Sequence, residues 1–133
     1  MTNDVVAHYL DGSLVKGVSL NVDPGRPSCH VQTREQGMVE VKLADLKALF
    51  YVRSFEGDPT HEEVNRLEPD DSRRIGARVV EVEFRDGEKL VAITPHYPPT
   101  RNLFFVLPAD RKSNNERVLV NQAACTGVRA LPA

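Results

Sequence analysis

Two stretches of similar sequence decide the fold: VVAHYLDG at residues 5–12 and VEVEFRDG at residues 80–87. In both, every second residue is apolar up to the dipeptide Asp-Gly. Alternation with a period of two predicts a half-buried β-strand. Asp-Gly between apolar runs predicts a tight hairpin in which both central turn residues take positive φ. We therefore expect each stretch to open a β-hairpin.

The similarity extends beyond these stretches and predicts an internal repeat. Residues 5–32 align with residues 80–107 without a gap, and six of these 28 positions are identical. The alignment resumes further along, with residues 39–41 against residues 118–120. The second copy is slightly longer because of extra residues in the polar loop 108–117, where an insertion costs little stability.

Each copy is expected to hold five short strands, with a helical turn at residues 44–47 before the fifth strand of the first copy. The strands of the first copy are expected at residues 5–10, 14–22, 28–33, 38–43 and 48–53. Those of the second copy are expected at residues 80–85, 89–94, 103–107 and 117–121, with a similar ending at residues 122–131. This pattern favours an all-β protein with minor α content, built as two tandem SH3-like or Sm-like small barrels. A unit of about 50 residues has a marginal core alone.

Three regions follow: a first barrel at residues 1–55, an acidic linker at residues 56–77 and a second barrel at residues 78–133. The linker holds seven acidic and three basic residues. Its Thr-His-Glu-Glu sequence at residues 60–63 fits a capping box, which predicts a short helix near residues 60–67. The barrels then carry 14 basic and 12 acidic residues, against a formal charge of −2 for the whole chain.

Composition excludes several classes of protein. The chain is 41% hydrophobic and 27% charged, and no apolar run approaches the ~20 residues of a membrane span. The first residues do not resemble a signal peptide. Two cysteines provide neither a disulfide framework nor a zinc pattern. We expect a cytoplasmic protein without membrane insertion.

No motif indicates catalysis or a cofactor. The sequence contains neither G-x-S-x-G nor a glycine-rich phosphate loop. His8, His30, His61 and His96 have no Cys, Asp or Glu at a recognisable metal-ligand spacing. We expect no metal, no cofactor and no enzymatic activity. A small-molecule hydrolase or isomerase with a site between the barrels is the weakest of the three function classes considered.

The candidate binding residues lie in loops. Arg26 and Arg101 occupy equivalent positions in proline-bearing loops, and guanidinium groups suit phosphate and carboxylate partners. The alternative is structural, with each arginine bonded to loop carbonyls or to a nearby carboxylate. The polar loop of the second copy indicates either a tight hairpin or an RNA contact. The candidates are Arg26, Arg101, Arg111, Lys112, Asn114, Asn115 and Arg117.

A further pattern is the run Ser-Arg-Arg-Ile-Gly-Ala-Arg at residues 72–78. Arg74 and Arg78 have the R-x-x-x-R spacing of PilZ domains, which bind cyclic di-GMP, and the run resembles that motif. The companion [DN]-x-S-x-x-G motif does not follow. A solvated hinge is the alternative interpretation of these arginines.

Over almost the whole chain, the sequence resembles an uncharacterised family of small bacterial proteins, a domain of unknown function. The resemblance is carried by residues 9–12, 25–27, 45–53, 55–58, 84–87, 108–110 and 113–117. It implies a bacterial intracellular setting, sometimes alongside signalling or surface-motility proteins. It implies no activity, cofactor or site residue.

The function expected from these observations is a non-catalytic protein-interaction adaptor in bacterial signalling or regulation. It would pair its main chain with a partner at an exposed strand edge, while loop arginines contact acidic groups. The alternative is an Sm-like module that binds RNA or a nucleotide, including cyclic di-GMP. We expect a protein partner, keep RNA as the alternative partner, and expect that strand edges allow homo-oligomers.

Overall fold

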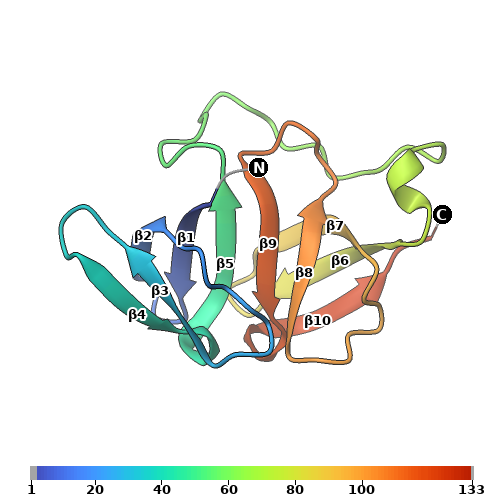
Figure 1. Ribbon diagram of the computed structural model, residues 1–133. Helices are drawn as coiled ribbons and strands as arrows, with labels where there is room; N and C mark the ends of the chain where they lie inside the picture. Colours follow the sequence, from blue (N-terminus) through green and yellow to red (C-terminus); the bar gives the residue numbers. More distant parts are fainter. Residues whose placement is uncertain (1–2, 133) are drawn as a thin grey trace.

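The computed structural model describes residues 3–132, and within them ten antiparallel strands form one continuous sheet. Its order is β10-β6-β7-β8-β9-β5-β1-β2-β3-β4, so β4 and β10 lie at the two edges (Figure 1). The prediction of an all-β protein is confirmed. None of the helical segments in the described part of the chain has the length and apolar character needed to cross a membrane.

The first half of the chain contains five strands and a 3₁₀ turn. They are β1 (Asp4–Tyr9), β2 (Leu14–Val18), β3 (Ser28–Gln32), β4 (Met38–Lys42), η1 (Leu43–Asp45) and β5 (Leu46–Val52). The second half begins with a 3₁₀ turn and contains a further five strands. These are η2 (Ser72–Arg74), β6 (Arg78–Phe84), β7 (Lys89–Thr94), β8 (Leu103–Pro108), β9 (Asn115–Asn121), η3 (Gln122–Ala124) and β10 (Cys125–Ala130).

The two Asp-Gly hairpins form as predicted between β1 and β2 and between β6 and β7. Gly12 has a φ of 90° and Gly87 a φ of 92°. Each glycine N–H donates to the carbonyl of the residue three positions earlier, at 3.0 Å. The prediction of positive φ at both central residues was wrong, because only glycines take positive φ among the described residues. The glycine alone supplies the left-handed residue that ends the turn.

The two halves have the same strand order, β5-β1-β2-β3-β4 and β10-β6-β7-β8-β9. Their strand partners follow the alignment of the two copies, and a 3₁₀ turn precedes the last strand of each half. The matched pairs are Val5↔Gly17 with Val80↔Ala92, Cys29↔Val41 with Phe104↔Val120, and Val5↔Tyr51 with Val80↔Ala130.

The halves meet where β5 pairs with β9, in the middle of the sheet (Figure 1). Leu49 of β5 and Leu119 of β9 belong to one core, whose other buried members come from the first half and against which Leu103 and Phe105 of the second half also pack. Ala48 and Val120 of the same two strands belong to a second core. Alternate side chains of a strand point to opposite faces, so both strands contribute to both cores. The expected linker is therefore not the only connection between the halves.

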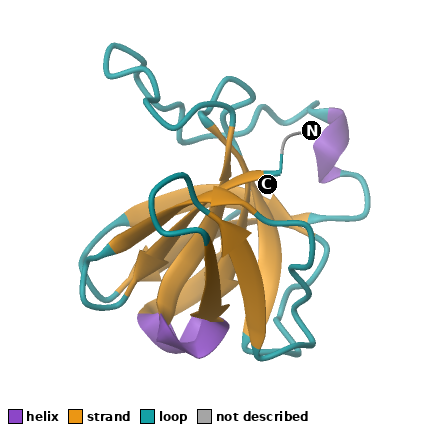
Figure 2. Cartoon of the chain, turned by 60° about the vertical axis from the view of Figure 1, so that its left-hand side comes forward, coloured by secondary structure: helices purple, strands orange, loops and turns teal. Residues whose placement is uncertain are grey.

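Residues 56–77, which we call the strap, contain no α-helix, so the helix predicted at residues 60–67 is wrong (Figure 2). The Thr60 hydroxyl donates to the Asp58 carboxylate at 2.6 Å, and no capping box forms. Leu67 is buried against the second half. Asp110 accepts the Val64 N–H at 2.9 Å. These tertiary contacts hold the strap without a helix, because helix propensity is only a weak preference.

One buried cation also ties the halves together. Lys47 of β5 is 6% exposed and reaches the hairpin between β6 and β7, where its Nζ lies 2.7 Å from Asp86 and 2.5 Å from Glu88. It also lies over the ring of Phe84, 4.8 Å from the centroid. Burial alone would lower the pKa of Lys47, but the hydrogen bonds to Asp86 and Glu88 outweigh it and raise the pKa above 10.5.

We predict that Lys47→Met lowers the free energy of unfolding by about 2 kcal/mol at pH 7, because two charge-assisted hydrogen bonds are lost while the aliphatic stem is kept. Urea denaturation measures this change. The raised pKa means that the contribution is complete below pH 10.5 and lost as the pH rises through the folded-state value. Lys42→Met, at an exposed position of β4, is the control, and equal losses in both variants would contradict the prediction.

Candidate functional site

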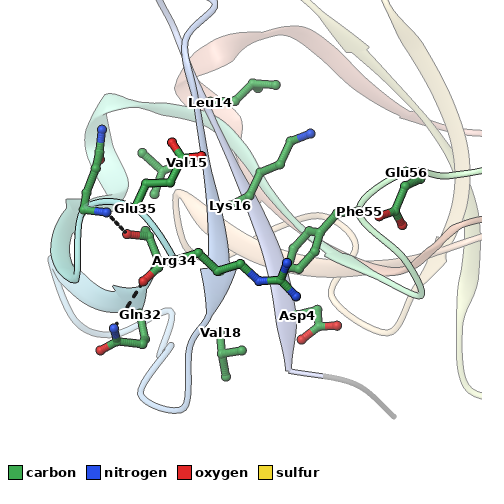
Figure 3. A pocket seen from close by; sticks show the side chains of 13 residues that line it. Asp4, Leu14, Val15, Lys16, Val18, Gln32, Arg34, Glu35, Phe55 and Glu56 are labelled. Carbon is green, nitrogen blue, oxygen red and sulfur yellow. Dashed lines mark hydrogen bonds between the residues drawn. The ribbon is translucent and has the colours of Figure 1, made fainter.

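A cavity of about 570 Å³ lies in the first half, between β2 and the β3–β4 hairpin (Figure 3). Its walls come from β1, β2, residues 32–36 and the segment that follows β5. We call it the open groove. Its lining includes apolar, basic and acidic side chains: Leu14, Val18, Phe55, Lys16, Arg34, Asp4, Glu35 and Glu56.

A glycine brings the two sides of the open groove together at one end. A Cβ on Gly17 would overlap the carbonyl oxygen of Gln32, so only glycine fits at this position. Among the described residues, β2 and β3 form a single antiparallel strand pair, between Val18 and Gln32. Toward Leu14, none of the described residues of the β3–β4 hairpin pairs with β2. That edge of β2 is left without a neighbouring strand, and the groove occupies the gap.

The open groove combines apolar surface with charged side chains. Leu14 is 49% exposed and Val18 is 41% exposed, which is high for aliphatic side chains. In Figure 3 the Arg34 side chain extends across the groove toward Phe55. Neither Lys16 nor Arg34 forms an ion pair among the described residues. Two cations beside exposed aliphatic groups suit a ligand with apolar and acidic groups.

The corresponding place in the second half is filled by the strap. Leu67 of the strap is 7% exposed and packs in a cluster with Val79, Val91, Ile93 and Ala109. In the alignment of the two halves, Val79, Val91 and Ile93 correspond to Asp4, Lys16 and Val18 of the open groove. Gln32 and Leu107 also correspond, because they pair with Val18 and Ile93. Ala109, two residues after Leu107, therefore corresponds to Arg34, two residues after Gln32. We call this cluster the filled groove.

Side chains of the second half and of the strap itself hold the strap in the filled groove. Asp110 accepts hydrogen bonds from the Val64 N–H at 2.9 Å and pairs with His61 Nε2 at 2.7 Å. Arg74 donates to the carbonyls of Leu67 and Glu68, at 2.5 and 2.7 Å. Burial would raise the pKa of Asp110, but hydrogen bonds from Val64, Lys112 and His61 outweigh it and lower that pKa.

One group of metal-type ligands was not found from the sequence. His61, Glu63 and Asp110 place one potential ligand atom each within 4.8 Å of one another. Asp110 lies far from His61 along the chain, so no sequence spacing could reveal the group. In this structure Asp110 is engaged by His61 and by the main chain of the strap. The group therefore serves to anchor the strap.

The two predicted loop arginines lie at one end of the molecule. Arg26 and Arg101 are both exposed. Their loops approach each other: if Gly25, beside Arg26, carried a Cβ, that atom would lie 3.5 Å from Nη1 of Arg101. A cavity of about 260 Å³ includes Pro24 of one loop and Arg101 of the other. The structure thus brings these two loops together.

The remaining loop candidates lie at the opposite end of β8, about 20 Å away for a six-residue strand. Arg111 pairs with Asp71 at 2.9 Å, and Lys112 is exposed. The Asn114 side chain bonds the main chain of Ser54, accepting its N–H at 3.2 Å and donating to its carbonyl at 2.9 Å. The proline-bearing loops and the Asn-Asn loop therefore do not form one surface.

The other candidates of this loop and the arginine motif have partners within the chain. The Asn115 N–H donates to Ser113 Oγ at 3.1 Å. The Arg117 guanidinium lies over the Tyr51 ring, 3.9 Å from its centroid. Arg74 bonds the strap carbonyls as described, and Arg78 lies over the ring of Tyr97 at 5.7 Å. These contacts hold the side chains of Arg74, Asn114 and Arg117 against other parts of the chain.

Comparison with protein-family models matches residues 1–132 to a model described as "Family of unknown function (DUF6982)". No curated protein and no solved structure matches the chain.

We predict that Leu67→Ala lowers the free energy of unfolding by about 2 kcal/mol, because the truncated side chain leaves a cavity in the filled groove. Urea denaturation measures the loss, and amide hydrogen exchange of residues 61–70 should become faster. Val64→Ala, at a half-exposed strap position, is the control. Unchanged exchange in Leu67→Ala would show that this side chain does not hold the strap.

The strap contacts should also weaken in acid. Because the pKa of Asp110 is lowered from 3.8 in the folded state, its contribution is present above that value and is lost as the pH falls through the folded-state pKa. We expect Asp110→Asn to destabilise the chain at pH 7 and to reduce the loss of stability between pH 5 and pH 2. Urea denaturation across that range provides the test, and an unchanged pH slope would refute it.

Proposed function

The chain belongs to the family of unknown function DUF6982, whose description gives no activity. From the surface of the chain itself, we propose that it is a non-catalytic protein-interaction adaptor. The open groove receives an extended segment of a partner protein. The observation that carries this proposal is the open edge of β2 beside a cavity of about 570 Å³. An extended segment gains main-chain hydrogen bonds at such an edge and places alternate side chains in the groove.

The proposal includes the internal repeat. The matched strand orders and registers support two copies of one small barrel-like unit, fused through β5 and β9. A repeated frame allows one groove to be filled by the chain itself while the other stays available. A setting in bacterial signalling or regulation is part of the proposal and rests on the sequence resemblance alone.

The lining of the open groove supports binding over catalysis. The described residues that line it include three carboxylates and Lys16 but no histidine, cysteine or serine, so the common pairing of a Ser or Cys nucleophile with a histidine base has no counterpart there. RNA or nucleotide binding has less support. Arg26 and Arg101 lie at one end of β8 and Arg111 at the other, where it pairs with Asp71. Arg74 is bonded to strap carbonyls.

A library of random 12-residue peptides, selected against the full chain, tests the proposal. We expect enriched peptides to bind at least tenfold more weakly to Val18→Asp than to the unchanged chain, as measured by fluorescence polarisation. Chemical shifts should change at residues 14–18 and 32–36. Ile75→Asp, at a position that is 85% exposed and outside the groove, should bind normally. The proposal fails if no peptide is enriched or if Val18→Asp binds equally well.

A further inference from the structure

We infer that the open groove takes an extended acidic segment with one aliphatic side chain, lying as the strap lies in the filled groove. This inference rests on the proposed function and specifies its partner. It starts from the correspondence between the two grooves. Leu67 packs on Val79, Val91 and Ile93, and the residues at these positions in the open groove are Asp4, Lys16 and Val18.

The filled groove shows what kind of segment this frame holds. The strap residues that enter it have no regular secondary structure. Asp110 accepts one N–H of the strap, from Val64, and Arg74 takes the carbonyl of Leu67. A single aliphatic side chain, Leu67, is buried there. A non-helical segment held through its main chain and one leucine is therefore already bound within this molecule.

The open groove keeps one of the four apolar residues that pack with Leu67 and has other apolar side chains nearby. Val18 corresponds to Ile93, and Leu14 and Phe55 add apolar surface. Leu14 and Val18 remain 49% and 41% exposed, whereas Ile93 is 3% exposed under the strap. An aliphatic side chain placed over Val18 would cover the apolar surface that corresponds to the surface covered by the strap in the other half. Burial of this apolar surface is the main favourable contribution to the binding free energy expected from such a contact.

Three apolar positions of the filled groove carry a charge in the open groove, and one of them is acidic: Asp4 stands where the filled groove has Val79. Lys16 stands where the filled groove has Val91, and Arg34 stands where it has Ala109. Neither cation has an ion-pair partner among the described residues. Carboxylates of the occupant would pair with them. Asp4, Glu35 and Glu56 line the same groove, so the acidic side chains of the occupant must fall beside Lys16 and Arg34 and away from these three carboxylates, which sets the register.

The strap sequence itself provides a probe with these properties. A labelled peptide THEEVNRLEPDD, which reproduces residues 60–71, carries five acidic residues and a leucine. We expect it to bind the full chain, measured by fluorescence polarisation, and to shift the amide resonances of residues 14–18. Replacing its leucine with alanine should weaken binding at least fivefold. Raising the salt concentration should also weaken binding, because charged groups make the contact.

Variants of the protein complete the test. Lys16→Glu combined with Arg34→Glu should weaken peptide binding at least tenfold, and a peptide with its Glu residues changed to Lys should bind this double variant better than it binds the unchanged chain. Lys42→Glu, an exposed cation outside the groove, is the matched control. Circular dichroism and urea denaturation check that the variants fold.

The outcomes separate this inference from the proposed function. If the strap peptide does not bind, or if its binding survives Lys16→Glu with Arg34→Glu, the inference is overturned. Resonance shifts confined to Val79 and Val91 would also overturn it, because they place the peptide in the filled groove. If library peptides bind in a Val18-dependent way but carry no acidic residues, the proposed function stands and this inference falls. If no peptide binds the open groove, both fail.

Discussion

The pairing of β5 with β9 is the contact on which the rest of the structure depends. Ala48 and Val120, partners in this pairing, lie far apart in the chain, and their strands lie between two hydrophobic cores. A strand covered on both faces must be apolar at nearly every position, which explains the sequence LKALFYV of β5. Lys47, the one charged residue in β5, is buried and paired with the second half. Neither core is complete without the strand that the other half supplies.

Much of this frame could be predicted because it depends on local sequence. Alternating apolar residues, Asp-Gly turns and the helical turn before the last strand each act over a few residues. The β5–β9 pairing could not be predicted, because nothing near residue 48 indicates which distant strand covers its second face. The helix predicted at residues 60–67 was wrong for a related reason: the burial of Leu67 and the hydrogen bond from Val64 to Asp110 come from distant residues.

The candidate site was harder to predict than the fold. Identity between the halves drew attention to Arg26 and Arg101, which lie in matched loops at one end of the molecule. The open groove instead depends on positions where the halves differ, such as Lys16 against Val91. A residue that is identical in both halves supports a feature that both halves have, such as a turn. Aligned positions with different residues, in contrast, distinguish the filled groove from the open groove. That contrast requires the strand registers, which place each residue of one half against its counterpart.

The distance along the chain between β5 and β9 also affects how the protein is made. When the first half leaves the ribosome, β5 can pair with β1, but the strand that covers its other edge has not yet been synthesised. Ala48 then remains on an uncovered face until β9 emerges. During this interval the edge of β5 is open to strands of other chains. The strap and the strands β6 to β8 separate β5 from β9 in sequence, so their combined length sets how long this exposed state lasts.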